Sequence, residues 1–340
     1  MLTPEFEARI MDALTQIKYS SFLNGDMGVC IFFFKKGKEE NNPKFTSEAE
    51  NILTRIIEEI GSNPRFDITT GITGIAIGIS YLVKNKYVEG DINEILSEVD
   101  AKIYKKFCLK TNFGGYSEMK LPLTDILLYY IIRYEETKSE NMKELQKRII
   151  SDLINWIYIH RDSSFYDEPF PFSLTEYKIC TYLYELGLLY SRGFEKERII
   201  HILLEMEYYL FSRYPTLHSN RLMLTTAVAY VSDKTGLEEW KEYAINLRRS
   251  INLNHIYEQE MFDKNIFPIN GLIGIWLTAE FYNNIEGFEP IHLEKNFYIQ
   301  RIINSSAWER MTYDNDFTMK YYAIDGYCGV RLFLDYLNKH

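Results

Sequence analysis

A repeated pair of glycines constrains the fold of this chain more than any other feature of its sequence. Two glycines separated by two residues open a continuous apolar run at four places, which begin at Gly25, Gly71, Gly271 and Gly326. The first two places lie 46 residues apart and the last two 55, while the 200 residues between Gly71 and Gly271 hold four steps of 50. Glycine-free apolar segments fill this interval, beginning at Leu121, Ser173 and Asn220. A regular period of this kind is typical of stacked structural units, and it predicts seven repeats.

Each repeat also holds a second kind of segment, in which apolar residues recur at helical spacing and charges occupy the other face. One example is the stripe of Ile52, Leu53, Ile56, Ile57 and Ile60. A helix that is apolar on all sides has to be buried, whereas an amphipathic helix can cover it and face water. The alternation of apolar and polar residues expected of strands is absent over any long window.

These patterns predict an all-α fold, an (α/α)7 toroid of seven helix pairs that forms a single domain over residues 1–340. The apolar helices would form an inner ring and the amphipathic helices an outer one. We expect the glycine pairs to let the backbones of adjacent inner helices approach closely. The 27 Tyr and 21 Phe fit either a core of large side chains or an aromatic-lined cavity.

Charge and cysteine usage exclude several classes of protein. The net charge of −10 argues against nucleic-acid binding, which needs clustered Lys and Arg. No apolar run is long enough to span a bilayer, and the first residues lack the basic start of a signal peptide. The four cysteines show no paired spacing. We therefore expect a reduced, cytoplasmic protein with neither a nucleic-acid nor a membrane partner.

Polar residues gather just before the predicted inner helices, where free helix N–H groups favour anionic groups. Asn, Asp and Thr also act as helix caps at such positions, so a purely structural role stays open. The candidate catalytic groups are His218, whose ordinary pKa lies near neutrality, and the carboxylates of Asp26 and Asp325. The candidate substrate-binding residues are Asn24, Asp67, Thr70, Asn220, Asn270 and Tyr327.

The seven helix pairs, with their glycine pairs at steps of about 50 residues, resemble the lanthionine synthetase C-like family. The resemblance implies an enzyme that closes thioether rings in peptides, by adding a cysteine thiol to a dehydrated serine or threonine. In zinc-dependent members, a Cys of the fifth repeat and a Cys-His pair before the glycine of the sixth bind the metal. At these positions this chain has His218 and the pair Ile269-Asn270. The resemblance thus implies a member without the zinc site and without another cofactor, acting with a precursor peptide or a peptide-modifying enzyme.

Three functions are compatible with the sequence. The first is a zinc-independent cyclase or a partner in peptide modification. The second is a catalytically silent module that binds a peptide or an enzyme at the mouth of the barrel. The third is a glycosidase-like helical barrel, which would need two carboxylates about 5 to 10 Å apart. Asp26, Asp67 and Asp325 are the candidates for that pair.

Overall fold

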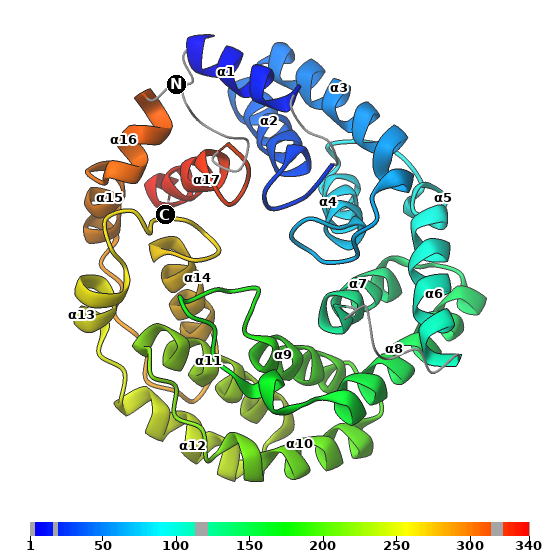
Figure 1. The fold of residues 1–340 in the computed structure, drawn as a ribbon, viewed down its shortest axis with the longest axis vertical. Coiled ribbons are helices and arrows are strands. Elements are labelled where there is room, and N and C mark those ends of the chain that lie inside the picture. The colour runs from blue at the N-terminus through cyan, green and yellow to red at the C-terminus, as the bar shows by residue number, and fades with distance from the viewer. Residues whose placement is uncertain (1–3, 16–19, 113–121, 314–321, 340) are drawn as a thin grey trace. The chain divides into compact units, whose positions relative to one another are not determined.

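The computed structural model describes residues 4–15, 20–112, 122–313 and 322–339 (Figure 1). Every regular element of these residues is helical, which confirms the predicted all-α fold. The α-helices are α1 (Pro4–Leu14), α2 (Asp26–Glu40), α3 (Pro43–Glu59), α4 (Ile72–Lys84), α5 (Ile92–Ile95), α6 (Ser97–Asn112), α7 (Leu123–Glu136), α8 (Glu140–His160), α9 (Lys178–Ser191), α10 (Lys196–Leu210), α11 (His218–Thr235), α12 (Glu238–Arg249), α13 (Leu253–His255), α14 (Leu272–Asn283), α15 (Lys295–Ile303), α16 (Ser306–Tyr313) and α17 (Tyr327–Lys339). Short turns of other helix types are η1 (Ile60–Ser62), η2 (Ser163–Tyr166) and η3 (Ile256–Glu260).

The chain divides into two compact units. The first comprises Met1–Leu153 and Met311–Leu332, and the second comprises Ile154–Arg310 and Phe333–His340. Within the described residues, no helix is both long enough and apolar enough to cross a membrane. Closure of the helix pairs into one ring, and a single domain over residues 1–340, stay predictions.

The first unit has two layers of helices. The largely buried helices α2, α4 and α7 follow one another in one layer, because α4 packs against both α2 and α7 (Figure 1). Amphipathic helices form the second layer, and α3 packs along α2. Helix α3 buries only the face that carries Phe45, Ala49, Ile52, Leu53 and Ile56. The predicted pairing of a buried helix with an amphipathic one is therefore present in this unit.

The second unit repeats this pairing. Helix α11 is buried from Ser219 to Ser232 and packs against α9, α12 and α14. Its amphipathic partner α12 buries only Trp240, Ala244 and Leu247. The prediction placed the start of one buried helix at Ser173, but α9 begins at Lys178. The residues between remain a loop, in which the Leu174 N–H donates to the carbonyl of Ile269 (2.8 Å). The start predicted at Leu121 lies outside the described residues, and α7 begins at Leu123.

The glycine pairs make room for the loop that precedes each helix, and not for a neighbouring helix as the sequence analysis expected. A Cβ atom at Gly74 would collide with the carbonyl oxygen of Ile68, and one at Gly274 would lie 2.6 Å from the carbonyl oxygen of Pro268. Each of these carbonyls belongs to the loop that leads into the same helix. The loop thus folds back over the first turn of the helix, so the pair of glycines fixes a loop conformation that recurs in the repeats.

Candidate functional site

Two carboxylates hold the N-terminus of α11. Glu168 accepts hydrogen bonds from the backbone N–H groups of Thr216 (2.7 Å) and Leu217 (3.4 Å). Glu260 accepts from the N–H groups of His218 (2.6 Å) and Ser219 (2.9 Å). Four consecutive N–H groups at a helix start are thus satisfied by two side chains from distant parts of the chain. The N-terminus of a helix favours anionic groups, so this arrangement is electrostatically stable.

The segment around Glu168 spans two helix starts. Beside Glu168, the carbonyl of Pro169 accepts from the Asn220 side-chain amide (2.7 Å), which ties the segment to α11. Further along, Leu174 is bonded to the carbonyl of Ile269, three residues before α14. The segment 168–174, which we call the covering segment, therefore runs from the start of α11 to the start of α14. Its exposed residue Phe170 has 85% of its surface in contact with solvent.

Two buried side chains in the first turn of α11 keep unused hydrogen-bonding atoms. Asn220 is fully buried and donates to Glu168 (3.0 Å) as well as to Pro169, while its Oδ1 atom has no hydrogen-bond partner among the described residues. The buried hydroxyl of Ser219 likewise has none within the described parts of the chain. Buried polar atoms are nearly always hydrogen-bonded, so these two are suited to a ligand or an ordered water molecule.

Hydrogen bonds, burial and a neighbouring charge shift the pKa values of Glu168 and His218 at this helix start. Burial alone would raise the pKa of Glu168, but the bonds from Asn220, Thr216 and Leu217 outweigh it and place the pKa below its ordinary value. For His218, burial and then the charge of Arg221 lower the pKa. The neutral imidazole fits its surroundings, because its Nδ1 atom accepts from the Asn252 N–H (3.1 Å). We infer that Glu168 is ionised and His218 is neutral at pH 7.

The candidate carboxylate Asp26 is enclosed in the first unit. Its side chain is fully buried and accepts from the Ser20 hydroxyl (2.9 Å) and from the N–H groups of Ser21 (3.1 Å) and Met27 (2.9 Å). Arg55 adds an ion pair at 3.4 Å. These bonds tie the loop before α2 to the helix, which is the geometry of a structural carboxylate.

The other candidates of the first unit lie in three loops that backbone hydrogen bonds join. The Leu23 N–H donates to Thr69 (3.2 Å), and the Leu23 carbonyl accepts from Asp325 (2.8 Å). These bonds bring together the loops that carry the predicted residues Asn24, Asp67, Thr70 and Asp325.

Each of these residues has its own surroundings. Asp67 accepts from both the N–H (2.6 Å) and the hydroxyl of Thr70, so that pair forms a local turn. Tyr327 is buried, with its ring edge-on to Phe32. The buried Oδ1 atom of Asn24 has no hydrogen-bond partner among the described residues. In the second unit, Asn270 is half-buried directly before the cap of α14.

The residues at the family's metal positions do not fit a zinc ion. Ile269 and Asn270 offer no thiolate or imidazole, which leaves the imidazole of His218 as the one zinc ligand among these three positions. Across the described residues, no group of three or more His, Cys, Asp or Glu side chains is placed to hold a metal. Burial raises the pKa of the Cys30, Cys180 and Cys328 thiols, and the Asp26 charge adds to this at Cys30. These thiols are therefore protonated and poor metal ligands.

Comparison with protein families adds independent evidence. Residues 6–120 match the model of the family described as Lanthionine synthetase C-like protein. The chain carries a lanthionine synthetase C-like region. This finding confirms the resemblance seen in the glycine repeats, two of which, at Gly25 and Gly71, lie inside the matched LanC-like region. Comparison with curated proteins gave no match.

Sequence reasoning found His218 and Asn220 but not the acids that bind their helix. Glu168 and Glu260 lie 41 to 52 residues from their partners on α11. No local pattern marks either residue, because Glu168 lies in a loop and Glu260 ends the short turn η3, and tertiary contacts bring both to α11. The predicted preference of helix starts for anions is the signal that points to them, since it calls for acidic partners.

Proposed function

We propose that this LanC-like protein is a binding partner in peptide modification, which holds a precursor peptide or a peptide-modifying enzyme without closing thioether rings itself. The observation that most supports this is the engagement of its candidate catalytic groups. Asp26 is buried in four polar contacts, and the Nδ1 atom of His218 is used by Asn252. A cytoplasmic setting fits the three buried free thiols of the described residues.

The start of α11 is the binding site that we favour in this proposal. An acidic group of the partner would compete with Glu168 for the N–H groups of Thr216 and Leu217. The Oδ1 atom of Asn220 and the hydroxyl of Ser219 would gain the partners that they lack among the described residues. The covering segment would have to move for this exchange, so the site would bind its partner with a change of loop conformation.

A direct test uses a synthetic peptide that contains one cysteine and one dehydroalanine. Binding is measured by fluorescence anisotropy of the labelled peptide, and ring closure by mass spectrometry after thiol alkylation. We expect binding with no ring closure beyond the rate in buffer. The same peptide with serine in place of dehydroalanine is the control, because it can bind but cannot cyclise. We also expect metal analysis of the native protein to show no stoichiometric zinc.

A zinc-independent cyclase is the second candidate, and the neutral imidazole of His218 favours it. Once its Nδ1 atom has released the Asn252 N–H, this base could take the proton from the peptide thiol while the sulfur bonds to the β-carbon of dehydroalanine. The α-carbon would then take up a proton, so the addition needs no other reactant. Accelerated ring closure that is lost in His218→Ala would establish this alternative and contradict the binding-partner proposal. A glycosidase is less favoured, because Asp26 and Asp67 are both engaged in local hydrogen bonds.

A further inference from the structure

A cavity of about 500 Å³ opens where α4 and α7 end. Its walls include Ser80 and Lys84 of α4, Asp91 and Asn93 at the start of α5, and Glu136 and Lys138 at the end of α7. A volume of this size is within the range of small-molecule sites. The cavity is at the opposite end of α4 from Asp67 and Thr70, which for a 13-residue helix is about 20 Å away. It is therefore separate from the loops that carry the predicted site residues.

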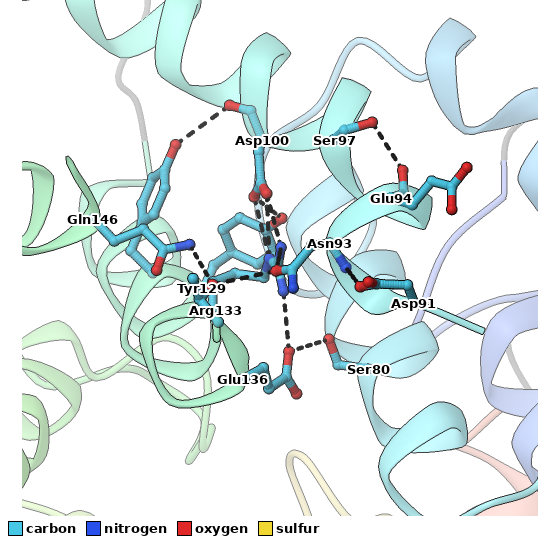
Figure 2. Close-up of polar contacts among 12 residues, drawn as sticks. Ser80, Asp91, Asn93, Glu94, Ser97, Asp100, Tyr129, Arg133, Glu136 and Gln146 are labelled. Atoms are coloured by element: carbon cyan, nitrogen blue, oxygen red, sulfur yellow. Dashed lines mark hydrogen bonds and ion pairs between the residues drawn. The ribbon is translucent and has the colours of Figure 1, made fainter. Parts of the chain in front are cut away.

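A buried arginine is bonded to two of the residues that line this cavity, Asn93 and Glu136 (Figure 2). The Arg133 side chain is only 1% exposed and donates to Asp100 (3.0 Å), Asn93 (3.1 Å) and Glu136 (3.4 Å). The hydroxyl of Tyr129 also donates to Asp100 (2.6 Å). A buried guanidinium needs paired carboxylates and well-formed hydrogen bonds, and Arg133 has both. It consequently fixes Asn93 and Glu136 as neighbours on one planar group.

The hydrogen bonds around Arg133 hold two side chains in place, those of Asn93 and Glu136, and each keeps one polar atom for a further contact. The Oδ1 atom of Asn93 accepts from Arg133 and from the Thr137 hydroxyl (3.3 Å), which orients the amide. The Oε2 atom of Glu136 accepts from Arg133 and from the Ser80 hydroxyl (3.0 Å). Neither Asn93 Nδ2 nor Glu136 Oε1 has a hydrogen-bond partner among the described residues, and Figure 2 shows the second Glu136 oxygen without a contact. Both side chains line the cavity.

The charge around the cavity favours a cation. Asp91, Glu135 and Glu136 face two lysines, Lys84 and Lys138. The C-terminal ends of α4 and α7 add partial negative charge. Both lysines are exposed and can turn their ammonium groups to solvent, whereas Glu136 is held in place by Arg133 and Ser80. With Arg133 included, the fixed charges of Arg133, Asp100 and Glu136 sum to −1 (one positive and two negative), so the fixed charge is negative.

We propose that this cavity binds an ammonium group with a carbonyl next to it, which is the chemistry of the amino end of a peptide. The ammonium would donate to Glu136 and pair with Asp91, while the carbonyl would accept from the side-chain amide of Asn93. The inference rests on the proposed function only for the source of the ligand, a peptide. A free amino-acid amide shares the same chemistry, and the experiment distinguishes the two.

Isothermal titration calorimetry of the full chain tests the site with three probes: Gly-Ala-Ala amide, its N-acetylated form and glycinamide. We expect the free-amine tripeptide to bind with a dissociation constant of about 1 mM or tighter, and the acetylated form at least tenfold more weakly. Tighter binding of the tripeptide than of glycinamide identifies a peptide end, and equal binding identifies a free amine. Equal affinity for the acetylated tripeptide, or no binding of any probe at 10 mM (about ten times that constant), overturns the proposal.

Variants locate the site. Glu136→Gln should weaken tripeptide binding at least tenfold, while Glu140→Gln, the same change on the exposed start of α8, should leave it unchanged. Because Glu136 also pairs with Arg133, its variant could lose stability. Val83→Trp therefore serves as a second variant, since it fills the cavity from a half-exposed position outside the hydrogen-bond network. Unchanged binding in Val83→Trp would contradict the assignment.

The outcome is independent of the proposed function. Glu168→Gln alters the start of α11 and should not change the affinity for the free-amine tripeptide. Failure of the dehydroalanine peptide to bind would refute the proposed function and leave amine binding at α4 and α7 intact. Loss of tripeptide binding in Glu168→Gln, with binding kept in Val83→Trp, would place the amine site at α11 and refute this inference.

Discussion

Glu168 is one of the two carboxylates that stabilise the start of α11. Its replacement by glutamine keeps an acceptor for the Thr216 N–H but removes the negative charge that the helix terminus favours. We expect Glu168→Gln to lower the free energy of unfolding by about 1 kcal/mol at pH 7. Urea unfolding followed by circular dichroism measures this. Glu176→Gln, an exposed acid that follows the covering segment, is the control and should change stability little.

The pH dependence of this loss is a second readout. The folded-state pKa of Glu168 is below the ordinary value of 4.5, so the carboxylate binds fewer protons in the folded chain than in the unfolded one. Its stabilising effect is therefore complete above that ordinary pKa and disappears as the pH falls through the folded-state pKa. The stability difference between the wild type and Glu168→Gln should shrink on acidification. If the stability difference stays constant from pH 7 to pH 3, which is about a unit below the ordinary pKa of a glutamate, the negative charge of Glu168 has no stabilising role.

His218 also stabilises the folded chain in its deprotonated form, which for a histidine is the neutral one. Burial and the charge of Arg221 lower its pKa from 6.5, so the unfolded chain binds more protons just below that pH. The stability contributed by its neutral form is present above 6.5 and is lost as the pH falls toward the folded-state pKa. We expect the wild type to lose more stability between pH 7 and pH 5 (a window about the ordinary pKa) than His218→Gln does. Parallel pH profiles of the two proteins would refute this prediction.

At the scale of an element, the paired glycines determine how a loop enters a buried helix. Gly74→Ala and Gly274→Ala would each place a Cβ atom against the carbonyl of the preceding loop. We expect each to cost about 1–3 kcal/mol, because the backbone has to shift to relieve the overlap. Gly61→Ala is the matched control, since nothing lies within 4 Å of its added Cβ atom. Thermal unfolding measures all three, and equal melting temperatures would contradict the packing role.

The sequence predicted elements better than it predicted their contacts. Continuous apolar runs after the glycine pairs at Gly25, Gly71, Gly271 and Gly326 predicted α2, α4, α14 and α17. A helix that is apolar on all sides has to be buried, so such a run is easily recognised. Exact helix ends are less predictable, since the helical run that starts at Ile92 is divided at Leu96 into α5 and α6. The acids at the start of α11 and the cavity beside Arg133 were not predicted, since both depend on residues brought together across 29 to 56 positions.

At the scale of the whole molecule, two helices contain residues of both compact units. Helix α8 includes Leu153 and Ile154, which belong to different units, and α17 includes Leu332 and Phe333, which do as well. Unfolding of one unit alone would have to interrupt both helices, and each interruption sacrifices hydrogen bonds and burial. We therefore expect the chain to unfold in one cooperative transition, as the predicted single domain requires.

The tryptophans allow this expectation to be measured. All four tryptophans belong to the second unit: Trp156, Trp240, Trp276 and Trp308. Tryptophan fluorescence therefore follows the unfolding of that unit. Far-ultraviolet circular dichroism, at the helical band of about 222 nm, follows the helices of both units. Coincident urea curves from the two probes, with one midpoint and one slope, would support a single cooperative domain. A fluorescence transition displaced from the dichroism transition would show that the second unit unfolds separately. In that case Gly74→Ala should move only the dichroism curve and Gly274→Ala should move both, because Gly74 belongs to the first unit and Gly274 to the second.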